Sequence, residues 1–536
     1  MALLDYTSSS LAYAISLITS SVLIYASYLI LLHPLRKFPG PPLARVTDWF
    51  AGVHAFKKDL HLEILRTHDK YGDHQPYSLG ESSIAVQEVG SIHISSPTCM
   101  QQKLSSAEIY QNGRVSKSHT YGSAVRNNVD NVFTARDKRV HQAKRKMISP
   151  ALTERAVKSF EPSLTEHITV YLKQILNASQ ASKPVNMSER ARYLALDIVT
   201  QLSFGYALQA QTSDENHFVS NALAFGLWRG NVWHHLFFLS KFWVYSIWDR
   251  VFFESREKYS QLLDRMIRSR MARGTNGERD FYSFISELDP DPDNVRKGGL
   301  WWEAHFLVVA GSDTTATTIA ATLFYLSRNP RCYQQLANEI RSTFTCTQDI
   351  KGGPQLASCH YLRACIDEAL RLSPPVPGTL WRTQDPDDDQ PLVIDGHVIP
   401  KGTIFGVSSY AIHHNEAYFP NSFAFKPERW LEGHTAGGKH TSDAFAAFSV
   451  GARSCAGKPM AYLELSLVIA RMLWYFDFEP ASGSLGEVGG GMAGGPTGRE
   501  RLGEFQLEDI FTARHDGPYL AFHPRGELWK ELESPS

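Results

Sequence analysis

The spacing of apolar and polar residues predicts a chain built mainly of helices. The longest helical pattern runs from about Arg296 to Arg328 and stops at Asn329-Pro330, because proline cannot continue a helix. At ~1.5 Å per residue this helix would be roughly 45–50 Å long, enough to cross a whole domain. The chain also predicts two amphipathic helices within 155–205 and single helices over 361–372 and 458–474. Residues 135–147, which are rich in Lys and Arg, predict a basic helix.

Shorter segments in which apolar and polar residues alternate predict small β-sheets. Residues 77–94 predict a hairpin, and residues 511–522 predict a second hairpin that turns near Gly517. Residues 97–130 are polar and irregular. Residues 482–499 are so rich in Gly, Ala and Ser that we expect a flexible loop there, without an assigned role.

The N-terminus carries an apolar run long enough to cross a membrane. Residues 11–32 contain no Asp, Glu, Lys or Arg, and about 20 such residues span a bilayer as a helix. A cleaved signal peptide is the alternative, but its apolar run is usually shorter and follows a basic start. Here the basic residues come after the run, which places the body in the cytosol. We therefore expect a lumenal N-terminus over 1–10, a transmembrane anchor over 11–32, a basic and proline-rich hinge with the start of the body over 33–59, and a single domain over 60–536.

Aromatic residues are concentrated between residues 224 and 253. Such a stretch is usually part of a hydrophobic core, but Trp and Tyr are also favoured where a protein touches the membrane interface. The pattern leaves both interpretations open.

Composition excludes two classes of protein. The net charge of −1 over 536 residues gives no basic footprint for nucleic acid. The six cysteines are sparse and show no C-x-x-C spacing, so we expect neither a disulfide framework nor a zinc site of that type.

One ten-residue stretch near the C-terminal end concentrates the candidate chemistry. It has the sequence Phe-Ser-Val-Gly-Ala-Arg-Ser-Cys-Ala-Gly over residues 448–457, and a predicted helix begins directly after it. A cysteine at a helix N-terminus meets backbone N–H donors and the positive end of the helix dipole, which both stabilise its thiolate. Arg453 can grip a carboxylate with two hydrogen bonds, and the glycines let a flat ligand approach the backbone. These properties suit a haem iron with Cys455 as its axial ligand, and a buried structural cysteine is the alternative.

The stretch resembles the haem-binding signature of the cytochrome P450 family, F-x-x-G-x-R-x-C-x-G. Every fixed position matches: Phe448, Gly451, Arg453, Cys455 and Gly457. With the segments described below, the resemblance covers roughly residues 33–525. It implies a mainly α-helical fold with small β-sheets, and haem b held between the long central helix and the cysteine stretch. The detailed sequence is similar to membrane-anchored fungal members of secondary metabolism, which implies the endoplasmic reticulum membrane.

The centre of the predicted long helix contains residues that disfavour helices. Its sequence over residues 310–315 is Ala-Gly-Ser-Asp-Thr-Thr, and such clustering predicts a local distortion. A threonine bonded back to the carbonyl four residues earlier is the plainer explanation. The stretch resembles the family's oxygen-activation motif, A/G-G-x-D/E-T-T/S. The resemblance implies that Ala310 and Gly311 make room for O2, and that Asp313 and Thr314 hold and relay protons.

The resemblance also assigns basic residues to the haem propionates. The predicted helix over 135–147 carries His141 and Arg145, which are four residues apart and so share one face. Arg382, in an extended segment, and Arg453 are the other expected partners.

Three further residues resemble the family's structural network. Glu368 and Arg371 have the spacing E-x-x-R on a predicted helix and can pair on one face, and Arg429 lies in the later segment Pro-Glu-Arg-Trp. The family buries them as a Glu–Arg–Arg network behind the haem. Such a network adds little net stability when intact, but losing one partner costs ~3–5 kcal/mol. We therefore expect a structural role for all three.

The resemblance implies a monooxygenase that inserts one oxygen atom from O2 into an apolar small molecule, by hydroxylation or epoxidation. Electrons would come from NADPH through a separate NADPH–cytochrome P450 reductase, since the chain has no Gly-rich dinucleotide fingerprint. The basic helix near Lys138 to Lys146 is a candidate contact face for that reductase. Two alternatives stay open: a haem-thiolate isomerase or dehydratase that does not activate O2, and a non-catalytic haem protein. The Asp313-Thr314 pair argues against the isomerase or dehydratase.

Overall fold

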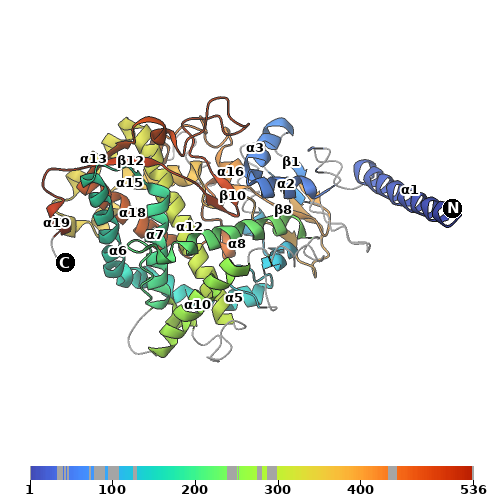
Figure 1. Ribbon diagram of the computed structural model, residues 1–536, viewed down its shortest axis with the longest axis horizontal. Helices are drawn as coiled ribbons and strands as arrows, with labels where there is room; N and C mark the ends of the chain where they lie inside the picture. Colours follow the sequence, from blue (N-terminus) through green and yellow to red (C-terminus); the bar gives the residue numbers. More distant parts are fainter. Residues whose placement is uncertain are drawn as a thin grey trace.

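Helices form most of the protein, and the 30-residue helix α12 (Gly299–Arg328) runs through the middle of the body (Figure 1). The computed structural model describes residues 2–32, 40–41, 44, 47–71, 74–77, 91–94, 108–124, 129–237, 250, 253–273, 280–285, 299–431 and 444–533. Its other helices are α1 (Ala2–Leu31), α2 (Trp49–Lys57), α3 (Leu60–Tyr71), α5 (Lys138–Ile148), α6 (Glu154–Gln180), α7 (Met187–Phe204), α8 (Phe218–His235), α10 (Phe253–Ala272), α11 (Phe281–Ile285), α13 (Pro330–Thr343), α14 (Pro354–Ala357), α15 (His360–Leu372), α16 (Ser409–His413), α18 (Lys458–Tyr475) and α19 (Lys530–Glu533).

The strands are short and form four small sheets in the described part of the chain. They are β1 (His74–Tyr77), β2 (Ser91–Ile94), β3 (Val115–Lys117), β4 (Val185–Asn186), β5 (Arg382–Gln384), β6 (Leu392–Ile394), β7 (His397–Ile399), β8 (Ile404–Gly406), β9 (Phe476–Pro480), β10 (Glu508–Ile510), β11 (Thr512–Arg514) and β12 (Tyr519–Pro524). The largest sheet has the order β1-β2-β8-β5-β3, with β2 parallel to β8 and the other pairs antiparallel. A second sheet has the order β4-β12-β9, and β6-β7 and β10-β11 are two-stranded.

The hydrophobic core forms where helices far apart in the sequence pack around α12. The largest cluster of buried apolar side chains combines residues of α6, α7, α12, α13, α15 and α18. Residues 316–326 of α12 are buried without interruption, so this half of the helix is enclosed by protein on every side, as a helix inside a large protein can be. The predicted helices over 361–372 and 458–474, the pair within 155–205 and the long helix are thereby confirmed.

α12 is an uninterrupted α-helix, so the structure does not show the expected distortion at its centre. Its hydroxyl side chains donate to the carbonyl oxygen four residues earlier: Thr314 to Ala310 (2.7 Å), Thr318 to Thr314 (2.9 Å) and Thr322 to Thr318 (2.7 Å). These back-bonds satisfy the hydroxyls inside an apolar helix without breaking its backbone ladder.

Helix α1 projects away from the body (Figure 1) and carries the apolar segment Ile15–Leu31, with Leu17 72% and Leu23 62% exposed. Within the described residues, α12 alone is long and apolar enough to pass as a membrane span, and 67% of its apolar window is buried inside the protein. It is therefore a core helix, and the transmembrane anchor over 11–32 stays a prediction. Residues 33–39, 42–43 and 45–46 of the segment predicted as hinge and start of the body lie outside the described residues, and Trp49–Lys57 of this segment form α2.

The predicted hairpin over 511–522 is wrong. The strand β11 pairs with β10, while β12 pairs with β4 and β9 in a different sheet. Alternation of apolar and polar residues predicts a strand but does not specify its partner. The hairpin over 77–94 is confirmed in its pairing, since β1 and β2 are antiparallel, although β1 begins earlier than predicted and residues 78–90 lie outside the described part.

The Gly-rich segment over 482–499 is not the flexible loop we expected. Its backbone forms hydrogen bonds from Gly491 N to Arg501 O (3.0 Å) and from Met492 N to Arg499 O (2.8 Å), and Arg328 of α12 donates to Gly486 O (2.7 Å). The glycines serve close packing: a Cβ at Gly486 would lie 2.0 Å from the Ala481 carbonyl oxygen. Glycine therefore signals tight turns here and not disorder.

Two other segments differ in part from the expectation. Within 97–130, which we expected to be irregular, residues 115–117 form β3 and residues 119–124 form a 3-10 helix. Within the aromatic stretch over 224–253, Trp233 is buried and belongs to α8, as a core residue would be. Residues 238–249, which carry many of its aromatic side chains, lie outside the described residues.

Candidate active site

Cys455 lies in the turn before α18, where the structure holds its main chain firmly. Cys455 N donates to Phe448 O at 2.8 Å, and Ser454 N donates to Gly451 O at 3.0 Å. Gly451 has a φ of 78°, and a Cβ there would lie 2.2 Å from the Tyr110 carbonyl oxygen, so this position requires glycine. The turn thus fixes the direction in which the cysteine side chain leaves the backbone.

The surroundings of Cys455 act on its thiol in opposite directions. Burial raises the pKa of the Cys455 thiol, while hydrogen bonds from the backbone N–H groups of Gly457 and Lys458 and the charge of Arg145 lower it. The side chain is nevertheless accessible, unlike Cys332, Cys359 and Cys365, which are buried. The accessible thiol thus has beside it the backbone N–H donors that stabilise a thiolate.

A cluster of buried and half-buried basic side chains includes Arg145 and Arg453, which lie close to this turn. Burial and then repulsion by Arg382 lower the pKa of Arg453 to about 10, and the same two causes hold the pKa of Lys117 well below its usual value. Burial, Arg453 and Lys117 lower the pKa of His141 to about 4. Arg145 lies beside the cysteine turn, where its Nη1 donates to Ser454 O at 2.8 Å. The structure therefore brings together His141, Arg145, Arg382 and Arg453, the four residues expected at the propionates, and adds Lys117.

The cations of this cluster are held mainly by main-chain oxygens. Arg453 donates to Ala135 O (2.6 Å) and to Arg136 O (2.9 Å), Arg382 donates to Trp381 O (2.9 Å), and Lys117 donates to Phe133 O. Such contacts fix the side chains but do not neutralise their charge. The cluster consequently favours an anionic partner.

At the centre of α12, the four predicted residues have different surroundings. The Thr314 hydroxyl donates to Ala310 O at 2.7 Å, so its one proton is engaged while its lone pairs can still accept. Asp313 is buried, and Thr512 of β11 donates to Asp313 Oδ2 at 3.2 Å. Burial raises the pKa of the Asp313 carboxyl and Arg192 lowers it.

Gly311 faces the neighbouring helix α7. A Cβ at Gly311 would lie 2.6 Å from Val199 Cγ2, so its glycine lets α12 and α7 pack closely. This contact gives Gly311 a packing reason that the sequence did not reveal, beside its expected role in making room for O2. Ala456, next to Cys455, packs against the apolar cluster that contains Val308 of α12, which places the cysteine turn and this helix at one apolar surface.

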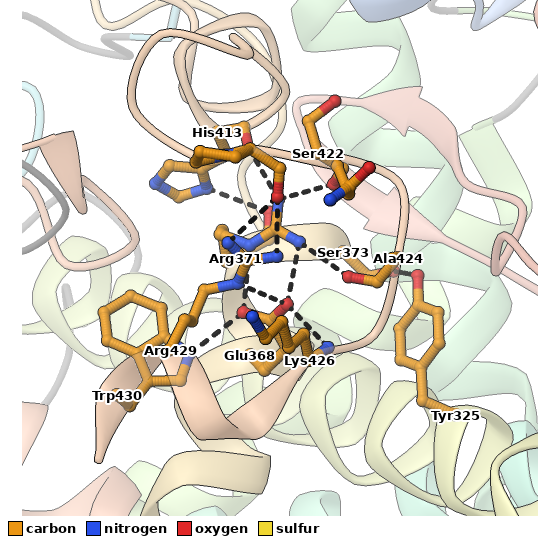
Figure 2. A network of polar contacts seen from close by, with 12 residues as sticks. Tyr325, Glu368, Arg371, Ser373, His413, Ser422, Ala424, Lys426, Arg429 and Trp430 are labelled. Carbon is orange, nitrogen blue, oxygen red and sulfur yellow. Dashed lines mark hydrogen bonds and ion pairs between the residues drawn. The ribbon is translucent and has the colours of Figure 1, made fainter. Parts of the chain in front are cut away.

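Glu368, Arg371 and Arg429 form the predicted network (Figure 2). Arg371 donates to both carboxylate oxygens of Glu368 at 2.9 Å, and Arg429 Nε donates to Glu368 Oε1 at 2.9 Å. Trp430 Nε1 adds a bond of 2.9 Å to Glu368 Oε2, and Arg371 Nη1 reaches the carbonyl oxygens of His413 and Ser422, each at 2.7 Å. The sequence showed the three charged residues but not the indole or the carbonyls that complete the network.

Comparison with known proteins agrees with this geometry. The family model described as "Cytochrome P450" matches residues 39–487. The chain is 34% identical over 509 residues to cytochrome P450 monooxygenase AKT7 of Alternaria alternata, an alignment that covers 92% of this chain and 94% of that protein. It is 32% identical to the cytochrome P450 monooxygenases poxM of Penicillium oxalicum, covering 92% and 91%, and apf7 of Gibberella fujikuroi, covering 94% and 96%.

The chain belongs to the cytochrome P450 family. It is accordingly an oxidoreductase of the monooxygenase type, for which the family implies haem, O2, a small-molecule substrate and electrons from a redox partner.

The residues of this cytochrome P450 fit a haem. An accessible thiol with two backbone N–H donors suits an iron ligand, and the cluster of Lys117, Arg382 and Arg453 with His141 suits the two propionates of haem b. The cations repel one another, and two carboxylates would relieve that repulsion. The donor set is therefore the one that this cofactor needs.

Lys117 was missed because it lies in a segment that the sequence showed only as polar and irregular. In the structure it is the last residue of β3 and pairs with Arg382 in the register of β3 and β5. Its Nζ lies 3.6 Å from the ring centre of Phe133 and 4.3 Å from that of Tyr121. No local pattern marks such a lysine, since only the strand pairing brings it to the cluster.

Proposed function

We propose that this cytochrome P450 hydroxylates or epoxidises an apolar small molecule in fungal secondary metabolism, with electrons from NADPH through a separate membrane-bound reductase. The observation that carries the proposal is the accessible Cys455 thiol just before α18, with Arg145 of the basic cluster beside it. The fungal cytochrome P450 monooxygenases that resemble the chain over nearly its full length support it. When bound, thiolate-ligated haem supplies the activation of O2.

The residues of the chain would bind the cofactor and move protons. Cys455 would hold the iron, and Arg145, Arg382, Arg453, Lys117 and His141 would hold the propionates. Thr314 Oγ1, which accepts no hydrogen bond from a described residue, would accept and pass on a proton, and the neighbouring Asp313, whose pKa burial raises, would exchange protons with it. Apolar and aromatic side chains near α12 would exclude water.

The test of the reaction uses membrane fractions supplied with reductase and NADPH. Reduced protein with carbon monoxide should show the long-wavelength Soret band of thiolate-ligated haem, and Cys455→Ser should lose it. A panel of apolar candidate compounds should yield products 16 mass units heavier that depend on NADPH. A wild-type protein that folds but shows only the histidine-type band contradicts the assignment.

A haem-thiolate isomerase or dehydratase is the second candidate. The specific observation in its favour is the bond from Thr314 Oγ1 to Ala310 O, which engages the proton that O2 activation would use. Product formation without NADPH or reductase, and with no gain of 16 mass units, would favour this reaction. A non-catalytic haem protein would give no product under either condition.

We also propose that α1 anchors the protein in the endoplasmic reticulum membrane by a single span, with the catalytic body in the cytosol. The exposed apolar side chains of Ile15–Leu31 and the direction of α1 away from the body support this topology (Figure 1).

Arg136, Arg139 and Lys146 are exposed near and on α5, where a reductase with an acidic face would dock. Both sequons, Asn177-Ala-Ser and Asn186-Met-Ser, should stay unglycosylated, and glycosidase-sensitive mass on either would contradict a cytosolic body.

A further inference from the structure

A small polar cavity lies between α8, the segment before β5 and the tight turn that joins β10 to β11. It is lined by Asn231 and His235 of α8, by Gly378 and Thr379, and by Asp509 and Phe511 around the turn. The cavity has room for about one water molecule or one small polar group. We call it the Asp509 cavity.

One of the two carboxylate oxygens of Asp509 accepts hydrogen bonds from the described residues and the other does not. Its Oδ1 accepts hydrogen bonds from Asn231 Nδ2 (3.2 Å) and from Phe511 N (3.1 Å). Among the described residues, none donates to its Oδ2, although the residue is only 2% exposed. A buried carboxylate oxygen without a donor is unfavourable, so this oxygen is suited to receive one from a ligand.

Gly378 faces Asp509 Oδ2 and, as a glycine, places no side chain next to this oxygen. A Cβ at Gly378 would lie 3.2 Å from Asp509 Oδ2, which is closer than the carboxylate tolerates without moving. His235 contributes a second unpaired polar atom, because its Nδ1 is buried and has no hydrogen-bond partner in the described part of the chain. Asp509 and His235, which each carry an unpaired polar atom among the described residues, thus both line one small cavity.

The backbone at this cavity is held in an unusual conformation. Phe511 connects β10 to β11 with a φ of 92°, which residues with a side chain rarely adopt. This turn aims Phe511 N at Asp509 Oδ1 and places the Phe511 ring 5.5 Å from Phe133 and 6.4 Å from His234, measured between ring centres. Strain of this kind persists where the surroundings impose it, and it is concentrated at binding sites.

The cavity lies near the proposed haem site in sequence and through ring contacts. Thr379 lines the cavity, and Arg382, three residues later in the chain, belongs to the basic cluster. On the other side, the ring of His234 lies 4.8 Å from Tyr121, over which Lys117 of the same cluster lies.

An aromatic wall leads from the cavity to the central helix. Phe511 contacts Phe133, which stacks on Phe306 of α12 with ring centres 5.7 Å apart. A polar cavity therefore lies at one end of an aromatic surface that reaches α12. An apolar substrate that packs on this surface would bring one end of itself to the cavity.

We propose that Asp509 determines substrate specificity by accepting a hydrogen bond, in this cavity, from one hydroxyl or amine group of an otherwise apolar substrate. The inference rests on the proposed function and adds to it: the substrate bears a donor group at a fixed distance from the carbon that is oxidised. Asn231 and the backbone of Phe511 orient the carboxylate, and Gly378 leaves room for the donor. A cavity that holds only a structural water is the competing explanation.

The test compares binding of paired probes to the ferric holoenzyme by the shift of its Soret band. The probes are phenylcyclohexane, dodecane and androstane, each beside its mono-alcohol, its primary amine and the methyl ether of the alcohol. The ether keeps an oxygen but lacks the donor. Burial raises the pKa of the Asp509 carboxyl to about 7, so binding is measured at pH 8.5, where the group is charged. We expect the wild type to bind an alcohol or amine roughly 10–150-fold more tightly than the matching hydrocarbon and ether, the range of a hydrogen bond to a charged group.

Asp509→Asn should abolish this preference, because its amide can place an NH2 group where Oδ2 accepted. Glu508→Gln is the matched control, since Glu508 is the neighbouring carboxylate but pairs with Lys58 (2.8 Å) at the surface. This control should keep the preference. Alcohols favoured alone, or amines favoured alone, identify the donor.

Three results would overturn the proposal: equal binding of the probe pairs by the wild type, a preference that persists in Asp509→Asn, or no binding of any donor-bearing probe. The first is the result that a structural water predicts. The carbon monoxide spectrum of each protein separates this failure from that of the proposed function. If the long-wavelength band is present and the probes are not distinguished, only the role of Asp509 fails.

Discussion

The carboxylate of Glu368 and the guanidinium of Arg371 face each other with two hydrogen bonds of 2.9 Å, and both side chains have no solvent exposure. Glu368 also accepts from Arg429, Trp430 and the backbone of Lys426, so one carboxylate joins α15 to the chain around residues 426–430 (Figure 2). The pair is structural in this geometry, because each partner is saturated by other groups of the chain.

Replacing Glu368 by Gln should therefore prevent stable folding and not merely slow the reaction. The variant leaves two buried guanidinium groups without their anion, which costs ~3–5 kcal/mol. We expect little or no protein with the thiolate-type carbon monoxide band, and a much lower midpoint of thermal unfolding for any that is recovered. Glu527→Gln, which breaks an exposed pair with Lys530 (2.7 Å), should change neither. A Glu368→Gln protein that folds normally but lacks turnover would assign the residue to catalysis instead.

Most of the helical framework could be predicted because it follows from local pattern. An apolar run that ends at Asn329-Pro330 predicts the helix over residues 299–328. Gly205 ends α7 in the left-handed conformation that favours glycine. Pairing between distant strands has no such local signal. That is why β12 was assigned to the wrong partner, and why the tight turn at Phe511 was not anticipated.

The candidate site was predictable only where a motif concentrates it. Cys455 and Arg453 stand two residues apart in one turn, so the sequence shows both. Lys117 and Asp509 reach the site through strand pairing and loop packing, and neither lies in a recognisable motif. Geometry also showed that Gly311 serves the contact with Val199, which no property of the sequence near Gly311 reveals.

Lys117→Met should weaken haem retention while leaving the fold intact. Methionine keeps the length and apolar stem of the side chain but removes the cation that we assign to a propionate. Because Lys117 is repelled by Arg382 and Arg453, its loss should not destabilise the protein before haem binds. The measurement is the rate of haem transfer to an excess of a haem-scavenging protein, which should rise. Lys138→Met, at a half-exposed lysine paired with Asp385 outside the cluster, should leave that rate unchanged. An unaltered rate in Lys117→Met would remove Lys117 from the propionate site.

Glu464→Gln should stabilise the protein more as the pH rises. Burial in α18 raises the pKa of Glu464 to about 8 from an ordinary value of 4.5, and its Oε1 has no hydrogen-bond partner within the described residues. The folded state thus binds this proton more tightly than the unfolded state, so the contribution is full below pH 4.5 and is lost as the pH rises toward 8. The loss is on the order of 5 kcal/mol. The midpoint of thermal unfolding of the wild type should fall between pH 5.5 and 8.5 by more than that of the variant. Parallel curves would show that Glu464 ionises freely, and Glu479→Gln, at an exposed glutamate, is the control.

Thr314→Ala should uncouple electron consumption from product formation. The hydroxyl donates to Ala310 O and leaves its lone pairs open, so it can accept a proton and pass it on without a change in the helix. Alanine keeps helix propensity, and the back-bond is not needed to hold α12 together, so haem and substrate should still bind. Loss of a proton relay is typically a ~10²–10⁴-fold effect where it limits the chemistry. We expect product per NADPH to fall and hydrogen peroxide to rise by the matching amount.

Thr318→Ala tests whether uncoupling comes from loss of proton transfer or from loss of the hydrogen bond to the carbonyl oxygen four residues earlier. Thr318 lies one turn further along α12 and donates to Thr314 O at 2.9 Å, so its replacement removes the same kind of bond, but at a position that is buried in the core. If the back-bond alone mattered, both variants would uncouple equally. If the Thr314 hydroxyl handles the proton, only Thr314→Ala should release peroxide, and Thr314→Ser, which keeps the hydroxyl, should restore coupling. Unchanged coupling in Thr314→Ala would remove Thr314 from the mechanism. It would also strengthen the isomerase or dehydratase alternative, because such a reaction needs no proton delivered to O2.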